Sequence, residues 1–275
     1  MDAREIATAL APTATVKELS SRQNRAFRLL EENGKSSVVK VYLTPARERR
    51  ERHAIEALAG IDGVPTILER GATDGTPWIR FVDAGTWNLA TLPRNLEVVK
   101  RAGRALRSLH GANAAITNLD SVIDAQYVAT HLRSTLDRLE RFRRRLGISA
   151  DLLAAAKIAS AEPPAGEPVP AHTRPVPENF LVSDKGALTL IDWEWATLAP
   201  PEWDLSMATW RFSKELGPEA ADALLEGYGA TFPAIRLKPW ITYHAATMML
   251  DAAERREGRL GDLAYLVDDL AESVA

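Results

Sequence analysis

The strongest constraint on the fold is one stretch, residues 170–196, which reads PAHTRPVPENFLVSDKGALTLIDWEWA. A polar, proline-rich loop leads into an apolar segment at 180–182, and the turn sequence SDKG separates it from a second apolar segment at 187–191. Asp and Gly tolerate the positive φ angles of tight turns, so we expect a β-hairpin. Because Asn179 precedes its first strand and Asp192 follows its second, the hairpin predicts both side chains in one cleft.

Asn179 and Asp192 also predict a metal site. Amide and carboxylate oxygens are hard ligands that suit Mg²⁺, an ion that usually keeps several waters and binds substrate phosphates as well. We therefore expect these two residues to hold Mg²⁺ beside a phosphate group.

The sequence from His172 to the block IDWE at 191–194 resembles the catalytic and metal-binding segments of aminoglycoside phosphotransferases and choline kinases. These families share the protein-kinase-like fold, and their usual pattern is His-Gly-Asp, four residues, Asn, a hairpin and Ile-Asp-Trp/Phe-Glu. Here Thr173 stands at the Gly position, and Arg174 replaces the Asp that acts as catalytic base in these families.

The resemblance covers most of residues 13–255 and implies a bilobal α+β fold. An N-lobe at 1–83, with an antiparallel five-stranded sheet and one helix, would cover the nucleotide. A mainly helical C-lobe at 84–275 would carry the catalytic hairpin. Local patterns predict N-lobe strands at 13–19, 25–30, 36–43, 66–71 and 77–82 and a helix at 45–60. They predict C-lobe helices at 97–111, 124–146, 206–216, 218–229, 238–256 and 260–273, with a Pro-, Gly- and Glu-rich connection within 156–170.

Lys40 lies in the middle of an apolar strand, and strand placement alone leaves open whether it reaches for solvent or serves as a buried charge. Glu51 shares one helix face with Ile55 and Leu58, at i, i+4 and i+7. The resemblance implies that Glu51 pairs with Lys40 and orients it on the α- and β-phosphates of the nucleotide.

Two other glutamates of the same helix, Glu48 and Glu56, are competing partners for the lysine. In the resembled families the first bend of the sheet sits over the phosphates, which here implies nucleotide contacts by Ser20 and Ser21. This bend has no glycine, so it is a weak phosphate-binding signal.

Arg174 decides how the chemistry is interpreted. A guanidinium, with a pKa above about 12, cannot accept the proton of a substrate hydroxyl. Loss of a general base costs roughly 10²- to 10⁴-fold in rate. Phosphoryl transfer nevertheless depends mainly on positioning and charge stabilisation, so Arg174 could contact the transferring phosphate as an arginine finger does. Alternatively it pairs with Glu178 or Asp192 and displaces Mg²⁺. Glu178 is the one new acid in the loop that could replace the base, and we expect the guanidinium itself to point into the cleft.

The resemblance gives two further residues structural roles. His172 is expected to bond to backbone, and Asp204 to support the catalytic loop by accepting hydrogen bonds from its backbone. His110, at the end of the helix predicted at 97–111, is expected to cap or pack rather than to catalyse.

We therefore expect an ATP- or GTP- and Mg²⁺-dependent phosphotransferase that acts on a hydroxyl, with a nucleotide-binding pseudokinase of regulatory or scaffolding role as the alternative. Acids could favour a cationic small-molecule acceptor and tryptophans could cage a quaternary amine, although ordinary packing and solvation explain both sets and are the preferred interpretation. A peptide hydroxyl stays open. The acids are Glu194, Glu202, Asp268, Asp269 and Glu272, and the tryptophans are Trp193, Trp195 and Trp203.

Composition excludes several other classes. The chain has no cysteine, which rules out disulfides, cysteine-zinc sites and thiol catalysis. A formal net charge of −3 and a pI near 6.0 give no general attraction to nucleic acid or anionic membrane. No apolar run approaches the roughly 18 residues of a membrane span, and the N-terminus lacks a signal-peptide pattern, so we expect a cytoplasmic protein.

Overall fold

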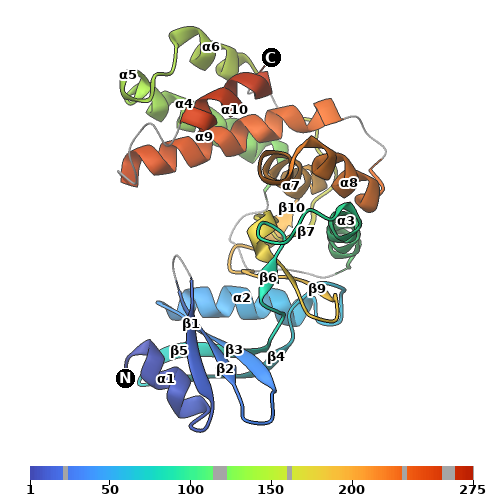
Figure 1. The fold of residues 1–275 in the computed structure, drawn as a ribbon. Helices are drawn as coiled ribbons and strands as arrows, with labels where there is room; N and C mark the ends of the chain where they lie inside the picture. Colours follow the sequence, from blue (N-terminus) through green and yellow to red (C-terminus); the bar gives the residue numbers. More distant parts are fainter. Residues whose placement is uncertain (21–23, 114–122, 160–162, 231–233, 256–263, 275) are drawn as a thin grey trace.

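The computed structural model describes residues 1–20, 24–113, 123–159, 163–230, 234–255 and 264–274 (Figure 1). The chain forms an N-lobe built on an antiparallel sheet and a mainly helical C-lobe, as the sequence predicts. This arrangement confirms the α+β, protein-kinase-like fold class.

Five antiparallel strands form the N-lobe sheet in the spatial order β1-β2-β3-β5-β4. Side chains alternate across a strand, so Val39 and Val41 of β3 enter the apolar core beneath the sheet, whereas Val38 and Lys40 face the cavity between the lobes. The alternation of side chains along β3 therefore directs the mid-strand lysine, Lys40, into the cavity. The strands are β1 (Thr15–Leu19), β2 (Arg25–Leu30), β3 (Ser36–Val41), β4 (Ile67–Thr73) and β5 (Thr76–Val82).

The N-lobe has two helices among its described residues, so the expectation of a single helix is wrong. Besides α2 (Pro45–Ala57), the chain begins with α1 (Ala3–Leu10). Asp2 accepts hydrogen bonds from two backbone N–H groups of the first turn, and the Glu5 carboxylate accepts one from the N–H of Asp2. This capping box fixes the helix start, and Ile6 then packs fully buried against the sheet.

The C-lobe helices match the predicted order but differ at several ends. The helix expected over 124–146 is broken after Glu140, and the helix expected to begin at 206 starts at Pro201, which suits a first helical turn. A helix at 150–159, which was not predicted, overlaps the start of the segment 156–170 that was expected to contain a connection. The helices are α3 (Leu96–His110), α4 (Ala125–Glu140), α5 (Arg143–Leu146), α6 (Ala150–Ala159), α7 (Pro201–Leu216), α8 (Pro218–Tyr228), α9 (Lys238–Arg255) and α10 (Ala264–Val274).

The predicted hairpin is present, with β8 (Phe180–Val182) and β9 (Leu188–Leu190) joined by a turn in which Gly186 has φ +78°. A third short strand, β6 (Trp87–Asn88), extends this sheet beside β8. A 3₁₀ turn, η1 (Pro177–Asn179), leads into the hairpin.

Two short strands, β7 (Val169–Ala171) and β10 (Thr197–Ala199), pair antiparallel and bring the two ends of the catalytic segment together.

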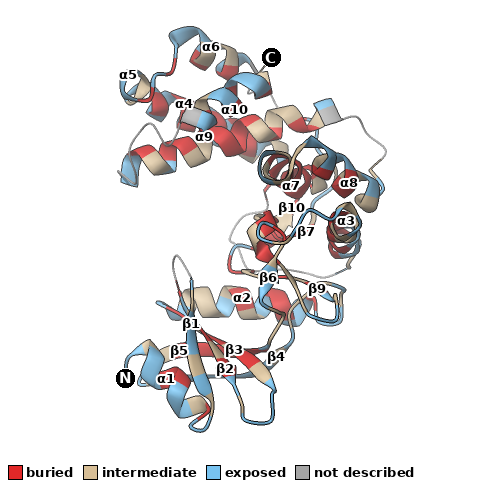
Figure 2. Cartoon of the chain, in the orientation of Figure 1, coloured by how far each residue is buried: buried red, intermediate tan, exposed pale blue. Residues whose placement is uncertain are grey.

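Buried residues are concentrated on α7 and on one side of α9 (Figure 2). Helix α3 approaches α8 so closely that a Cβ on Gly103 would lie 2.1 Å from the Leu224 carbonyl oxygen. The C-lobe therefore offers a rigid base for the hairpin. Over the described ranges, no helix combines the length and apolarity needed to cross a membrane.

Candidate active site

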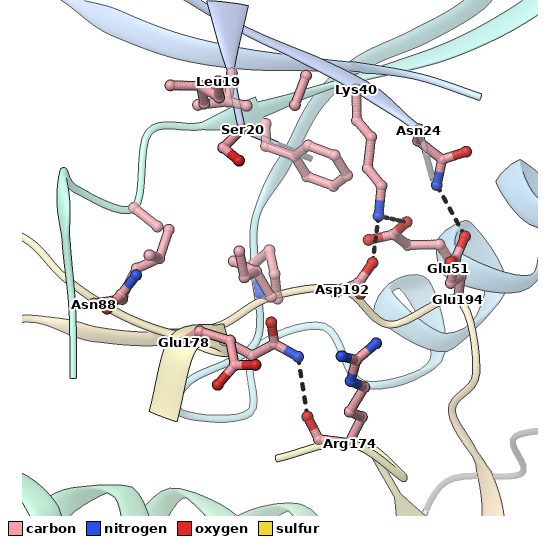
Figure 3. Close-up of a pocket in the computed structure, with 18 of the residues that line it drawn as sticks. Leu19, Ser20, Asn24, Lys40, Glu51, Asn88, Arg174, Glu178, Asp192 and Glu194 are labelled. Atoms are coloured by element: carbon pink, nitrogen blue, oxygen red, sulfur yellow. Dashed lines mark hydrogen bonds and ion pairs between the residues drawn. The ribbon is translucent and has the colours of Figure 1, made fainter. Parts of the chain in front are cut away.

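A cavity of about 630 Å³ lies between the two lobes. Apolar side chains from both lobes, including Ala26, Val38 and Phe81 above and Leu181 and Ile191 below, line one part of it. Charged side chains from β3, α2 and the catalytic segment line another part (Figure 3). An apolar slot that continues into a charged region suits a ligand with a flat base and a polyanionic tail.

Lys40 is the centre of the charged region. Its Nζ lies 2.7 Å from Glu51 Oε2 and 2.7 Å from Asp192 Oδ1, so the predicted ion pair between Lys40 and Glu51 is confirmed. The competing glutamates, Glu48 and Glu56, both pair with Arg52 on their own helix.

Glu51 is held rigidly, because it is 2 % exposed and accepts further hydrogen bonds from the Tyr42 hydroxyl at 2.9 Å and the Trp193 backbone N–H at 3.3 Å. Burial raises the pKa of Glu51 against the opposing effect of Lys40. Burial alone would lower the pKa of Lys40, but the carboxylates of Glu51 and Asp192 outweigh it and raise that pKa. The lysine is therefore a permanent cation aimed into the cavity.

Asp192 stands at the end of the hairpin in a left-handed conformation, with φ +74°. Burial would raise its pKa, but Lys40 above all, and also His172 and Arg174, lower it, so the carboxylate stays ionised. Its partner in the predicted metal site, Asn179, is buried and donates from Nδ2 to the Arg174 carbonyl oxygen at 3.0 Å.

Because that bond uses the amide nitrogen, the Oδ1 of Asn179 remains available as an acceptor with respect to the described residues. The donor set fits Mg²⁺, since both residues offer oxygens on the cavity wall. Glu51, Asp192 and Glu194 each also have an oxygen within 4.8 Å of the others.

The guanidinium of Arg174 is directed toward Asp192 (Figure 3), as the spacing of the loop predicts. In the part of the chain that the structure describes, Arg174 makes no ion pair, and Asp192 is paired with Lys40 instead. The alternative in which Arg174 pairs with Glu178 or Asp192 is therefore not observed. Arg174 is thus a partly exposed cation that faces the cavity beside Asp192.

Glu178 lies on another wall of the cavity, apart from Asp192 (Figure 3). Its Oε2 is buried and finds no hydrogen-bond partner within the described ranges. A carboxylate oxygen without a donor is uncommon in a folded protein and suggests a ligand contact.

The loop around His172 is fixed by Asp204 of α7, a residue with no exposed surface. Asp204 accepts hydrogen bonds from the backbone N–H groups of His172 at 2.8 Å and Thr173 at 2.7 Å, and contacts His110 Nε2 at 3.1 Å. The pKa of Asp204 is lowered because these donors and the nearby imidazoles outweigh its burial. The expected structural roles of these residues are confirmed.

His172 is fully buried, and burial lowers the pKa of its imidazole. Its Nε2 bonds to the Ile191 carbonyl oxygen at 2.9 Å, which ties the loop to the second strand of the hairpin. Thr173 adopts φ +71°, a conformation in which a β-branched residue is strained.

The structure adds cavity residues that sequence reasoning missed. Asn24 Nδ2 donates to Glu194 Oε2 at 2.9 Å, so the bend after β1 is tied to the end of the catalytic segment. Arg28 donates to the Asp83 carboxylate at 2.7 Å and to the Gly85 carbonyl oxygen at 2.6 Å, joining β2 to the connection between the lobes. Of Asn24, Arg28 and Glu194, only Glu194, two residues after Asp192, was considered from the sequence as a residue of the cleft.

Of the two serines expected to contact phosphate, Ser20 lines the cavity, whereas Ser21 lies outside the described residues.

The acids and tryptophans considered for a cationic substrate do not form a common site. Among the described cavity-lining residues, Glu194 is the one member of that acidic set. Glu202 pairs with Arg236 at 2.6 Å and Asp269 with Lys214 at 2.6 Å, with each carboxylate buried in the C-lobe and its cationic partner partly exposed.

The tryptophans also serve packing. Trp193 and Trp203 are buried, and each donates its indole N–H to a backbone carbonyl, while the half-exposed Trp195 stacks under Arg50 at 5.3 Å. Core packing is therefore confirmed for Trp193 and Trp203, and no aromatic cage forms among these three tryptophans. The expectation that the acids face water is wrong for three of them, which are buried, whereas Asp268 and Glu272 are exposed; the buried acids are Glu194, Glu202 and Asp269.

Residues 15–238 match the family model described as the phosphotransferase enzyme family. The chain belongs to this phosphotransferase family. Because the match extends from β1 into the start of α9, it includes the whole cavity described above.

Solved structures of phosphotransferases share the fold. A thermostable mutant of the aminoglycoside phosphotransferase APH(4)-Ia, in a ternary complex with AMP-PNP and hygromycin B, has a TM-score of 0.74 at 13 % identity, covering 100 % of this chain and 98 % of that one. The GDP complex of aminoglycoside 2'-phosphotransferase-IIIa has a TM-score of 0.74 at 15 % identity, covering 99 % of each chain.

Macrolide 2'-phosphotransferase MphH from Brachybacterium faecium, as the apoenzyme, has a TM-score of 0.67 at 18 % identity, covering 96 % of this chain and 97 % of that one. At these identities the likeness establishes the fold of this phosphotransferase family member and not its acceptor. A search of curated proteins gave no match.

Proposed function

We propose that this chain is an ATP- or GTP- and Mg²⁺-dependent phosphotransferase that moves a phosphoryl group to a hydroxyl of a small molecule. The observation that carries the proposal is the convergence of Lys40, Glu51 and Asp192 on one cavity wall, with Lys40 Nζ 2.7 Å from each carboxylate. Such a cation beside a carboxylate serves nucleotide phosphates and a metal ion together.

Each residue then has a distinct task. Lys40 contacts the α- and β-phosphates, Glu51 holds it in place, and Ser20 lies near the phosphates at the end of β1. Asn179 and Asp192 would hold Mg²⁺, which when bound neutralises charge on the phosphates. That GDP and AMP-PNP occupy relatives of the same fold supports the nucleotide part.

In this proposal, Arg174 stabilises the charge of the transferring phosphoryl group, and this takes the place of catalysis by a general base. The acceptor oxygen forms a bond to the terminal phosphorus, the bond to the bridging oxygen of the leaving nucleoside diphosphate breaks, and the hydroxyl proton passes to solvent. Arg174 cannot take that proton, but its unpaired guanidinium can bind the transferring phosphoryl oxygens.

Thermal shifts with ATP and GTP, each with and without Mg²⁺, test the binding part. A ligand that binds the folded state raises the melting temperature, and Asp192→Ala should abolish the Mg²⁺-dependent part of that rise. Asp184→Ala changes an exposed aspartate in the turn of the same hairpin and should leave it intact. An unchanged Mg²⁺ effect in Asp192→Ala would sink the metal assignment.

Arg174→Asp tests the catalytic part. Nucleoside diphosphate release is followed with small-molecule alcohols, amino sugars and a serine peptide as acceptors. We expect the natural chain to transfer phosphate and Arg174→Asp to slow the transfer.

The second candidate, a nucleotide-binding pseudokinase, is favoured by the guanidinium at the base position. It would gain support if Arg174→Asp alone were active, or if neither form transferred phosphate while both bound nucleotide.

A further inference from the structure

One corner of the cavity is not used by the proposed nucleotide contacts. Glu178 of η1 lines it together with Arg211 and Glu215 from the last turns of α7. All three side chains belong to the C-lobe, on the side of the cavity away from the sheet. If the proposed function is correct, the acceptor must lie in a part of the cavity that the nucleotide contacts do not use, and this corner is such a part.

The arginine in this corner forms an ion pair with one of the two glutamates. Arg211 donates from Nε to Glu215 Oε1 at 2.9 Å, and its NH2 donates to the same oxygen. Burial alone would lower the pKa of Arg211, but Glu215 first and Glu178 next raise it, so the guanidinium is fixed as a cation. The corner therefore contains a built-in counter-ion between its two acids.

Glu178 is the group left unsatisfied. Its Oε2 is buried and has no hydrogen-bond donor among the described residues, although the carboxylate is near enough to raise the pKa of both Arg211 and Glu215. A buried carboxylate oxygen without a donor is unfavourable, so a donor brought by a ligand would be accepted there.

The charges of this corner are only partly paired. Glu215 is paired with Arg211, whereas the guanidinium of Arg174 points away from the corner toward Asp192 and does not pair with Glu178. A cationic acceptor would have to compete with Arg211 for the same carboxylates, whereas a hydroxyl can donate to Glu178 without displacing any charge.

We propose that this corner receives an uncharged, hydroxyl-bearing part of the acceptor and that Arg211 determines the specificity by keeping cationic groups out. The inference rests on the proposed phosphotransferase function, because it places the acceptor at this end of the cavity. The proposed acceptor site differs from an open cluster of acidic residues, because Arg211 already pairs with one of its two acids.

The test uses agmatine, an amine with a guanidinium group, as the cationic probe, titrated calorimetrically into the full-length nucleotide-free protein. We expect little or no binding by the natural chain and at least about tenfold tighter binding by Arg211→Gln, which exposes both acids. Arg211→Lys keeps the charge and should behave as the natural chain does. Arg138→Gln removes an arginine from an exposed pair with Glu254, outside the cavity, and is the matched control without effect.

The double variant Arg211→Gln with Glu178→Gln should lose the increase in agmatine affinity that Arg211→Gln shows. Equal agmatine affinity in the natural chain and Arg211→Gln would overturn the proposal. If Arg211→Gln does not fold, Arg211→Met is the second variant. The natural chain also tests the proposal by itself. If it binds agmatine and Glu178→Gln abolishes that binding, the corner does not exclude cations and the proposal is refuted. Failure of the phosphotransferase proposal would appear separately, in the nucleotide and Mg²⁺ thermal shifts.

Discussion

Asp204→Asn should destabilise the protein through the loop that carries His172 and Arg174. The carboxylate has no exposed surface, and its two oxygens accept from different backbone donors, Oδ2 from the N–H of His172 and Oδ1 from that of Thr173. An asparagine keeps one oxygen and turns an NH₂ group toward the other donor. One buried N–H then loses its acceptor, and the remaining bond loses its charge.

An orphaned buried donor costs about 1–3 kcal/mol, and hydrogen bonds to charged groups contribute about 1.5–3 kcal/mol each, so we expect the free energy of unfolding to fall by about 2–4 kcal/mol. Urea denaturation at neutral pH measures this directly. In a chain of this size each kcal/mol corresponds to a melting-temperature shift of about 2–4 °C.

Asp222→Asn, at an exposed position of α8, is the control and should stay within about 0.5 kcal/mol of the natural chain. An equally small change in Asp204→Asn would refute the supporting role.

Acid titration gives a second check on Asp204. Its folded-state pKa lies below the ordinary value of 3.8, so its contribution to stability is present above that value and is lost as the pH falls through the folded pKa. The stability difference between the natural chain and Asp204→Asn should therefore shrink below pH 3.8.

Substitutions at three further positions test other parts of the structure. Thr173→Gly removes a β-branched residue from φ +71°, whereas Thr173→Val retains that strain. Because both variants lose the hydroxyl bond to Trp195, urea titrations should show the glycine variant to be the more stable of the two by about 1 kcal/mol. His244 is buried with its pKa lowered from 6.5 to about 4, so the unfolded chain binds the proton first, and about 3 kcal/mol of stability is lost as the pH falls between these values. His244→Gln should flatten that part of the stability profile, and an unaltered pH dependence would contradict the assignment. Gly103→Ala places a Cβ 2.1 Å from the Leu224 carbonyl oxygen, so calorimetric melting should show a loss of more than about 1 kcal/mol, and a neutral result would mean that α3 and α8 separate freely.

Local periodicity made much of the fold predictable. Alternation of side chains in β3 put Lys40 on the face opposite Val39 and Val41, and helical spacing put Glu51 on the inward face of α2. The turn residues at 183–186 fixed the hairpin, and with it the order in which Asn179 and Asp192 arrive. The helix at the N-terminus was also signalled, by the Asp2–Glu5 capping box, but its short length hid the signal.

The sequence by itself thus determined the strands, the hairpin and which residues could carry charge, because these follow from contacts between near neighbours in the chain. The tertiary structure alone decided which charges meet. Lys40 and Asp192 are separated by 152 positions, and Asn24 and Glu194 by 170 positions. It also decided that Asp192 pairs with Lys40, so that Arg174 beside it has no ion-pair partner among the described residues. Side-chain contacts over such separations depend on how the two lobes pack, and no local periodicity encodes that geometry.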